Sequence, residues 1–135
     1  MLRATRRGFR KPTFVISEAG RRVATLAGID RRGCEFAVAG RRFQVFHEGR
    51  TRITLTGSAG YVATADGDGS HWSISSAAGR WEFTSSDSAW ELRLDGDPIG
   101  VVRRESATAW QADLPGDLPL PLRVFVFYLA LEPAA

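Results

Sequence analysis

Arginine is the residue type with the clearest chemical pattern in this sequence. Arginine pairs recur every ten residues, at Arg21-Arg22, Arg31-Arg32 and Arg41-Arg42, and Arg50 and Arg52 continue the series. A guanidinium group presents a planar fork of N–H donors that matches the oxygens of a phosphate or a carboxylate. These eight arginines are therefore the candidate anion-binding and lipid-headgroup-binding residues of the chain.

The charge is distributed unevenly along the chain. Residues 1–52 contain 13 Lys and Arg against 4 Asp and Glu, a net +9, whereas residues 53–135 contain 5 against 11, a net −6. A fold that keeps these two halves apart has one basic and one acidic side. Seventeen of the 18 basic residues are arginine. A GC-rich coding bias explains this preference as well as phosphate binding does, so both explanations stay open.

Residue types that serve catalysis or zinc binding are present but are not grouped. Cys34, His47 and His71 lie far apart in the sequence, and a zinc site needs three or four converging ligands. Cys34 alternates with Phe36 and is expected to face the core. The serines are numerous, but none lies in a Gly-x-Ser-x-Gly elbow. We therefore predict a protein that is not an enzyme, with no catalytic residues, no metal and no cofactor.

The segment Asp66-Gly-Asp-Gly-Ser70 has oxygen-bearing side chains at alternate positions, as a calcium loop has. The rest of the calcium pattern is missing, because His71 stands where the loop needs glycine and Ala77 stands where it needs glutamate. A hairpin turn is the better interpretation of this segment.

Short stretches of alternating apolar and polar residues, separated by breaks rich in Gly, Asp and Ser, run from Thr13 to Leu114. Alternation with a period of two is typical of strands, and glycine supplies the positive φ that tight hairpin turns need. Four tryptophans, at 72, 81, 90 and 110, fall on the apolar faces and are expected to pack inward. The predicted strands are Thr13–Ser17, Arg22–Leu26, Cys34–Ala39, Arg42–His47, Arg52–Thr56, Tyr61–Ala65, His71–Ser76, Arg80–Thr84, Ala89–Leu94, Ile99–Arg104 and Thr108–Leu114.

The last apolar stretch, Leu118–Leu131, contains one charge, Arg123, and no polar face. It is shorter than the roughly 20 residues that a membrane span needs. Its Val and Phe residues suit a strand, but Pro119 and Pro121 suit the first turn of a helix and Pro133 marks its end. A helix that is apolar all round must be enclosed.

These elements predict a mainly β protein, a closed antiparallel β-barrel of about 11–12 strands around a central hydrophobic C-terminal α-helix. Closure removes the edges of the sheet and shields the helix from water. We expect a basic N-terminal arm at residues 1–12 and one barrel domain at residues 13–135, with the helix at about 119–132. A basic start without an apolar leader segment, together with a single cysteine, favours a cytoplasmic protein.

Three segments of the C-terminal part resemble a known family. These are Trp90-Glu-Leu-Arg-Leu-Asp-Gly-Asp-Pro-Ile-Gly-Val-Val-Arg-Arg104, Ala109-Trp-Gln-Ala-Asp-Leu114 and the apolar stretch from Leu118. They are similar to the end of the tubby C-terminal-like superfamily, which includes LURP-one-related and phospholipid scramblase-like domains, here as a bacterial member. The resemblance implies a twelve-stranded barrel around a hydrophobic C-terminal helix. It also implies binding of phosphoinositide headgroups through basic side chains on the barrel exterior.

Three hypotheses for function follow. The first is a non-enzymatic tubby-like domain, peripheral at the membrane, whose basic rim binds anionic phospholipid headgroups or another phosphorylated partner. The second is a structural or protein–protein interaction domain. The third is a barrel that binds a small hydrophobic ligand, which requires an open apolar interior. Nucleic acid is not expected as a partner, because the sequence contains no helix suited to reading a groove.

Overall fold

The computed structural model describes residues 1–8 and 11–134, which form twelve strands and one α-helix. The strands are β1 (Leu2–Arg7), β2 (Thr13–Glu18), β3 (Arg21–Asp30), β4 (Gly33–Val38), β5 (Arg41–His47), β6 (Arg52–Gly57), β7 (Gly60–Gly67), β8 (His71–Ser76), β9 (Gly79–Ser86), β10 (Ala89–Leu94), β11 (Asp97–Arg104) and β12 (Ala109–Asp113). The helix α1 (Leu120–Leu131) follows, and a short 3-10 turn, η1 (Glu132–Ala134), comes after it.

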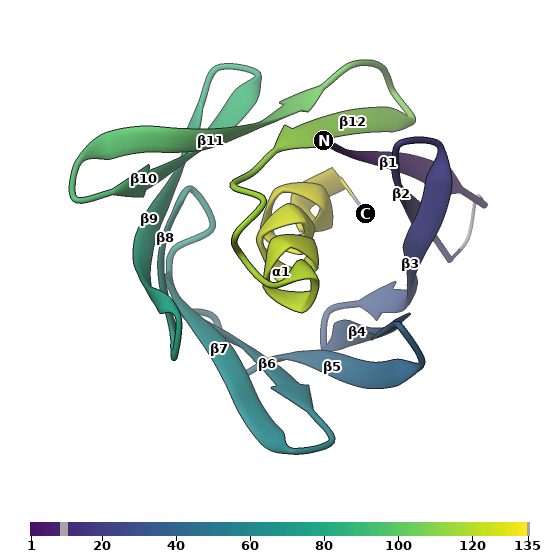
Figure 1. The fold of residues 1–135 in the computed structure, drawn as a ribbon, viewed down its shortest axis with the longest axis horizontal. Helices are drawn as coiled ribbons and strands as arrows, with labels where there is room; N and C mark the ends of the chain where they lie inside the picture. Colours follow the sequence, from purple (N-terminus) through teal and green to yellow (C-terminus); the bar gives the residue numbers. More distant parts are fainter. Residues whose placement is uncertain (9–10, 135) are drawn as a thin grey trace.

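The strands form a closed antiparallel barrel in which each strand pairs with its neighbours in the chain. Pairing of β1 with β12, from Leu2 opposite Ala112 to Thr5 opposite Ala109, closes the ring. Figure 1 looks along the barrel and shows α1 in its centre. The predicted fold class, a closed antiparallel barrel around a C-terminal helix, is confirmed.

The expectation of a basic arm at residues 1–12 is wrong for Leu2–Arg7, because this segment is strand β1 of the barrel. Leu2 and Ala4 are buried inside, while Arg3 is exposed and lies 3.6 Å from Glu105 of the β11–β12 connection. The sequence did not reveal this strand, because Leu2 and Ala4 are its two buried residues and the residues around them are mostly arginine. Residues 9 and 10 of the expected arm, and residue 135 of the expected barrel domain, lie outside the described part of the chain.

The helix α1 is buried on all sides, as its sequence predicts. Every residue from Val124 to Leu131 is buried. Pro119 is the N-cap and Pro121 lies in the first turn, where the missing N–H groups have no helical partner to lose. Arg123, the one charged residue within α1, donates from Nε to the Leu118 carbonyl (3.0 Å) and from Nη1 to Glu18 Oε2 on β2 (3.0 Å).

The inward faces of the strands supply the wall around α1. Trp72, Trp81 and Trp110 are buried as expected, whereas Trp90 is half-buried. Leu94, expected on the apolar face of its strand, is 41% exposed. Leu94 lies near the tip of the β10–β11 hairpin, which projects away from α1 (Figure 1). The pairing of β10 with β11 also shifts register between Leu92 and Arg93, just before this residue.

A second polar contact, besides that of Arg123 with Glu18, joins the wall to the helix. His47 Nε2 on β5 lies 2.8 Å from the Tyr128 hydroxyl, and Tyr128 is fully buried. A buried hydroxyl without a partner is costly, so His47 gives the otherwise apolar α1 a fixed rotation within the barrel.

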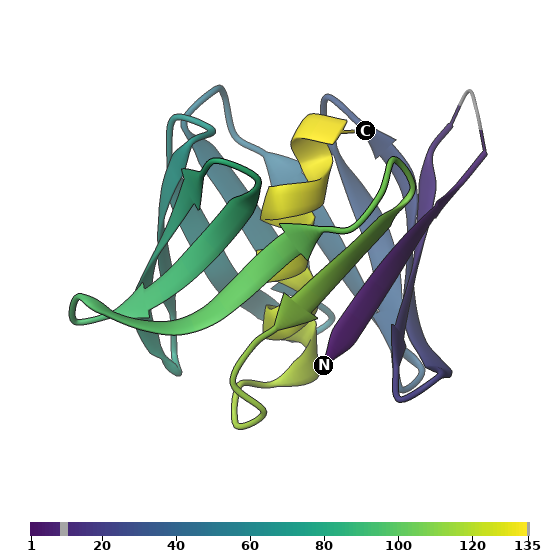
Figure 2. The ribbon, with the colours of Figure 1, turned by 90° about the horizontal axis from the view of Figure 1, so that it is seen from above.

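Each end of the barrel carries a different set of turns, because consecutive turns of an antiparallel meander alternate between the two ends. We call the end where α1 begins the entry end, which also carries the β2–β3, β4–β5, β6–β7, β8–β9 and β10–β11 turns. The opposite end, where α1 finishes, is the exit end (Figure 2, top). Two entry-end turns carry alanine in the left-handed region, Ala19 with φ 52° and Ala39 with φ 51°, each followed by a glycine with φ 78°.

Replacing both turn alanines with asparagine should stabilise the protein. Left-handed backbone costs an ordinary L-residue roughly 1–2 kcal/mol, and asparagine tolerates it better. We expect Ala19→Asn/Ala39→Asn to raise the free energy of unfolding by about 1 kcal/mol in urea titrations. Ala78→Asn is the control, since Ala78 is an exposed turn residue without a positive φ. An equal gain in the control would contradict the explanation.

Removing the His47–Tyr128 contact should give non-additive losses of stability. Tyr128→Phe loses one hydrogen bond and should cost about 1 kcal/mol, whereas His47→Leu strands the buried hydroxyl and should cost about 1–3 kcal/mol. The double variant should cost less than the sum of the two. Strict additivity in a double-mutant cycle of unfolding free energies would refute a direct interaction.

Candidate functional site

The barrel keeps the two charged halves of the sequence on different sides. Because strand order around the ring follows chain order, β1 to β5 form one continuous side and β6 to β12 form the rest. The basic excess of residues 1–52 therefore lies over β1–β5 and the acidic excess lies on the remainder of the surface. The condition that the sequence left open, that the fold separates the halves, is met.

The eight candidate arginines are all exposed, but they form two groups of four and not one. The ten-residue spacing equals one strand plus one turn, so successive pairs fall at opposite ends of the barrel. The entry group consists of Arg21, Arg22, Arg41 and Arg42, and the exit group consists of Arg31, Arg32, Arg50 and Arg52.

The entry group carries unneutralised positive charge. Within the described chain, none of its four guanidinium groups has a carboxylate within 4.0 Å. The nearby acidic residue of the β2–β3 hairpin, Glu18, is already bound by Arg123 at 3.0 Å and by the Met1 amino group at 4.0 Å. The two arginine pairs begin β3 and β5, which are separated by β4 alone, so their strands are about 10 Å apart.

The helix adds to the positive field at the entry end. Its N-terminus lies at that end, and its first turn contains no acidic residue. The aligned peptide dipoles of a helix place roughly half a positive charge at its N-terminus. The entry end thus combines four exposed arginines with the positive pole of α1.

The exit group is partly neutralised. Arg52 Nε donates to Asp66 Oδ1 at 2.8 Å, and this hydrogen bond, followed by the charge of Asp66, raises the pKa of Arg52. Asp30 lies two residues before Arg32 and accepts a hydrogen bond from its backbone N–H at 2.6 Å. In the described chain the guanidinium groups of Arg31, Arg32 and Arg50 have no carboxylate within 4.0 Å, so the two groups differ by one paired arginine. The positive pole of α1 at the entry end makes the entry group the stronger anion-binding candidate.

A groove on the outer face of the barrel opens beside the entry group. It has a volume of about 470 Å³ and runs over β3 to β6. Its lining includes Arg42 together with Thr25, Gln44, Thr56 and Ser58, while Ala37 contributes only a methyl group. Glu35 is its one acidic lining residue. The groove provides hydroxyl and amide groups next to an unpaired guanidinium.

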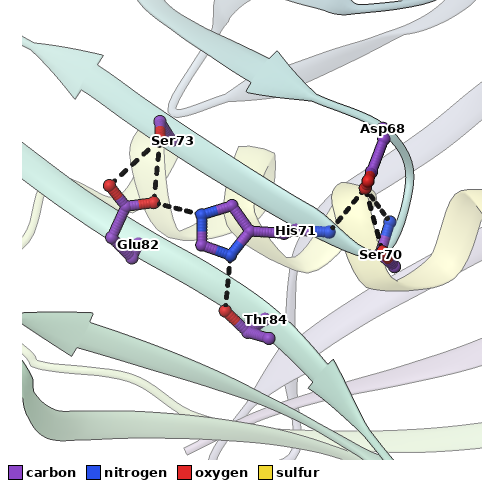
Figure 3. A network of polar contacts seen from close by, with 6 residues as sticks. All are labelled: Asp68, Ser70, His71, Ser73, Glu82 and Thr84. Carbon is purple, nitrogen blue, oxygen red and sulfur yellow. Dashed lines mark hydrogen bonds and ion pairs between the residues drawn. The ribbon is translucent and has the colours of Figure 1, made fainter.

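A second polar cluster lies on the outer face of β8 and β9 (Figure 3). His71 Nδ1 lies 2.9 Å from the Thr84 hydroxyl, and its Nε2 lies 2.7 Å from Glu82 Oε2. Ser73 donates to both oxygens of Glu82, at 3.0 and 2.8 Å. At the adjacent turn, Asp68 Oδ1 accepts from the N–H and hydroxyl of Ser70 and from the N–H of His71.

This cluster brings a hydroxyl, an imidazole and a carboxylate into contact, which is the first requirement for activating a nucleophile. However, the His71 and Glu82 side chains are 49% and 50% exposed and lie on the open outer surface of the sheet. His71 faces Thr84, and Ser73 faces Glu82, as directly opposed cross-strand neighbours. The cluster fits a structural role in holding β8 to β9. The predicted hairpin turn is confirmed at residues 68–70, where Asp68 makes these hydrogen bonds, while Asp66 and Gly67 end β7.

Cys34 is buried, as its alternation with Phe36 predicts. Burial first, and the charges of Glu35 and Asp30 after it, raise its pKa to about 12. A thiol is a weak nucleophile and metal ligand until it is deprotonated. In the described part of the chain, no three His, Cys, Asp or Glu side chains gather closely enough to hold a metal ion.

The contacts of His47 with Tyr128 and of His71 with Thr84 were not predicted from the sequence. Tyr128 is 81 residues from His47, so only the strand register and the rotation of α1 bring them together. The one available signal was the position of a polar residue, His47, in phase with the apolar residues Phe43 and Val45.

None of the helices within the described residues combines the length and the apolar character that crossing a bilayer requires. Comparisons of the chain with protein-family models, with curated proteins and with solved structures find no match. The tubby-like resemblance therefore stays a prediction.

Cys34 should be unreactive in the folded protein and should make the protein less stable at alkaline pH. Its folded pKa of about 12 exceeds the ordinary value of 9.0, so its contribution is complete below pH 9 and is lost as the pH rises toward 12. The expected slope is about 1.4 kcal/mol per pH unit. Urea titrations from neutral to alkaline pH should show a steeper loss for the natural protein than for Cys34→Ala. Fast labelling of the folded protein by a thiol reagent at neutral pH would contradict the burial of the thiol.

Proposed function

We propose that this protein is a non-enzymatic tubby-like domain that associates peripherally with the cytoplasmic face of a membrane, where its entry group binds anionic lipid headgroups. The observation that carries the proposal is the set of four exposed arginines at one end of the barrel without carboxylate partners in the described chain. Each basic residue near an anionic bilayer contributes about 1 kcal/mol, so the group supplies roughly 4 kcal/mol.

Exposed apolar side chains at the same end support a membrane as the partner. In the described chain the large apolar residues that are most exposed are Met1 at 64%, Tyr61 at 59% and Leu94 at 41%, and all three lie at the entry end. Stable membrane association generally needs two signals, such as basic residues plus an apolar insertion. Met1 precedes β1 and Tyr61 lies on β7, so these two flank β3 and β5, the strands that the arginines begin, whereas Leu94 lies on β10 and is not counted as a membrane contact.

The acidic turns decide which way the entry end faces. Asp95 and Asp97 flank the β10–β11 turn and Asp117 lies before α1, so the β10–β12 side of the entry end repels an anionic surface. We infer that the barrel tilts, with the β2–β5 turns toward the bilayer and the β10–β11 hairpin, with Leu94, away from it.

The filled interior favours this proposal over a barrel that carries a small hydrophobic ligand inside. Side chains of α1 from Leu122 to Leu129, apart from Arg123, occupy the centre of the barrel, where such a ligand would lie. The exposed position of the His71 cluster supports a role other than catalysis.

Two matched quadruple variants test the proposal. Replacing Arg21, Arg22, Arg41 and Arg42 with glutamine removes the entry group, and replacing Arg31, Arg32, Arg50 and Arg52 removes the same charge at the exit end. At about 1 kcal/mol per arginine, the entry variant should lose at least about a hundredfold in partitioning onto vesicles of phosphatidylserine and phosphatidylcholine. The exit variant should lose much less, because its four arginines lie at the end of the barrel opposite to the proposed docking end.

Cosedimentation with these vesicles is the measurement, and vesicles of pure phosphatidylcholine are the control. Binding of the natural protein should weaken as salt is added, because exposed charges are screened. Circular dichroism should confirm that both variants remain folded. Equal losses in the two variants, or equal binding to neutral vesicles, would rule the proposal out.

A further inference from the structure

A second cavity, separate from the entry group, opens at the exit end between α1 and the wall formed by β9 to β12. Its volume is about 390 Å³, within the range of small-molecule sites. Its lining includes Ser85, Trp90, Arg104, Trp110 and Ala130. Figure 2 shows the last turn of α1 near the β9–β10 and β11–β12 hairpins at this end.

Strand register places the polar and aromatic lining residues on the inner face of the barrel. Trp90 pairs with Ser85 on β9 and with Val102 on β11, and Val102 is buried. Arg104 pairs with Trp110, which is also buried, so the guanidinium shares the inner face with the indole. The cavity therefore lies on the inner side of the sheet, where the interior of the barrel opens at the exit end, and not on the outer surface of the sheet.

The space exists because α1 contributes little volume at this level. Ala130 contributes only a methyl group, and Pro133 follows immediately after the helix ends. Lower in the barrel, phenylalanine and tyrosine side chains of α1 fill the interior completely.

The aromatic walls of the cavity are held by neighbouring rings. Phe83 stacks on Trp90 with ring centroids 4.9 Å apart and an interplanar angle of 21°. Phe14 meets Trp110 edge-on, at 5.3 Å and 74°. Both indoles are thus fixed before any ligand arrives, which lowers the entropy that binding must cost.

Arg104 is also fixed in place. Its Nε donates to the Ser106 carbonyl (2.9 Å), its Nη2 donates to the Ala107 carbonyl (3.0 Å), and its guanidinium carbon lies 5.0 Å from the Trp110 ring centroid. In the described chain it has no carboxylate partner. A guanidinium has five N–H donors, so three remain after these two bonds.

We propose that this cavity binds a small organic anion with a planar aromatic body. The half-buried indole of Trp90 provides a flat apolar surface for the ring system, and Arg104, which lies over the buried indole of Trp110, provides a donor pair for a carboxylate. Ser85 and Ser88 add hydroxyl groups to the lining. Asp87, the acidic lining residue, belongs to the exposed β9–β10 turn, so an anion is favoured only on the Arg104 side of the cavity.

Naphthoate is a suitable probe, and neutral naphthalenemethanol and cationic naphthylmethylammonium have nearly the same shape. Calorimetric titration should detect naphthoate binding, and the indole N–H signals of Trp90 and Trp110 should shift in proton–nitrogen spectra. The charged contact should make naphthoate bind about tenfold or more tightly than the neutral analogue.

Two adjacent arginines give a matched pair of variants. Arg104→Gln should remove the preference for naphthoate over naphthalenemethanol. Arg103→Gln, which removes the same charge from the exposed side chain paired with Gln111, should leave the preference unchanged. Ala130→Leu, which fills the cavity, should abolish binding of both probes while the fold, followed by circular dichroism, is kept.

Three results would overturn the proposal: tighter binding of naphthylmethylammonium than of naphthoate, equal effects of the Arg103 and Arg104 variants, or no binding of naphthoate by the natural protein. The test is independent of lipid docking, because the entry group lies at the opposite end of the barrel.

Discussion

The burial of α1 is the constraint on which the rest of the structure depends. A helix with apolar side chains on every face gains stability only when every face is covered, and a closed ring of strands covers it completely while leaving no sheet edge. The two polar groups that α1 carries into the interior, the Arg123 guanidinium and the Tyr128 hydroxyl, each receive a partner from the wall, Glu18 and His47. These two contacts fix the position and the rotation of a helix whose other side chains are apolar.

Closing the ring in chain order also determines where the charges lie. Neighbours in the sequence become neighbours around the barrel, so a charge difference between the two halves of the chain becomes a difference between two sides of the surface. Alternation of the turns then divides each side between the two ends. A series of arginine pairs spaced by one strand and one turn is therefore split in two, and in the described chain Arg52 of the exit group is the member of either group that has a carboxylate partner.

Local patterns in the sequence predict most of this fold, because strands and turns obey local rules. Alternation and glycine-containing breaks identify β2 to β12, and the prolines around α1 mark both of its ends. Strand β1 is missed because its inward residues are only Leu2 and Ala4, set among arginines. Contacts such as His47 with Tyr128 depend on register and helix rotation, which no local pattern encodes. The division of the arginines between the two ends of the barrel, in contrast, follows from their ten-residue spacing in any antiparallel sheet whose strands pair in chain order.

The two ends of the barrel differ because α1 itself is asymmetric. Its N-terminal pole adds positive potential to the end that already carries unpaired arginines and the exposed side chains of Met1 and Tyr61. Its C-terminal turn fills less space, because Ala130 stands there and larger side chains stand deeper in the barrel. The wall that faces this turn carries Trp90 and Trp110. A single buried helix thus contributes to a positively charged surface at one end and to an open cavity with aromatic walls at the other. Recognition of an extended anionic surface suits the first geometry, and recognition of a small molecule suits the second.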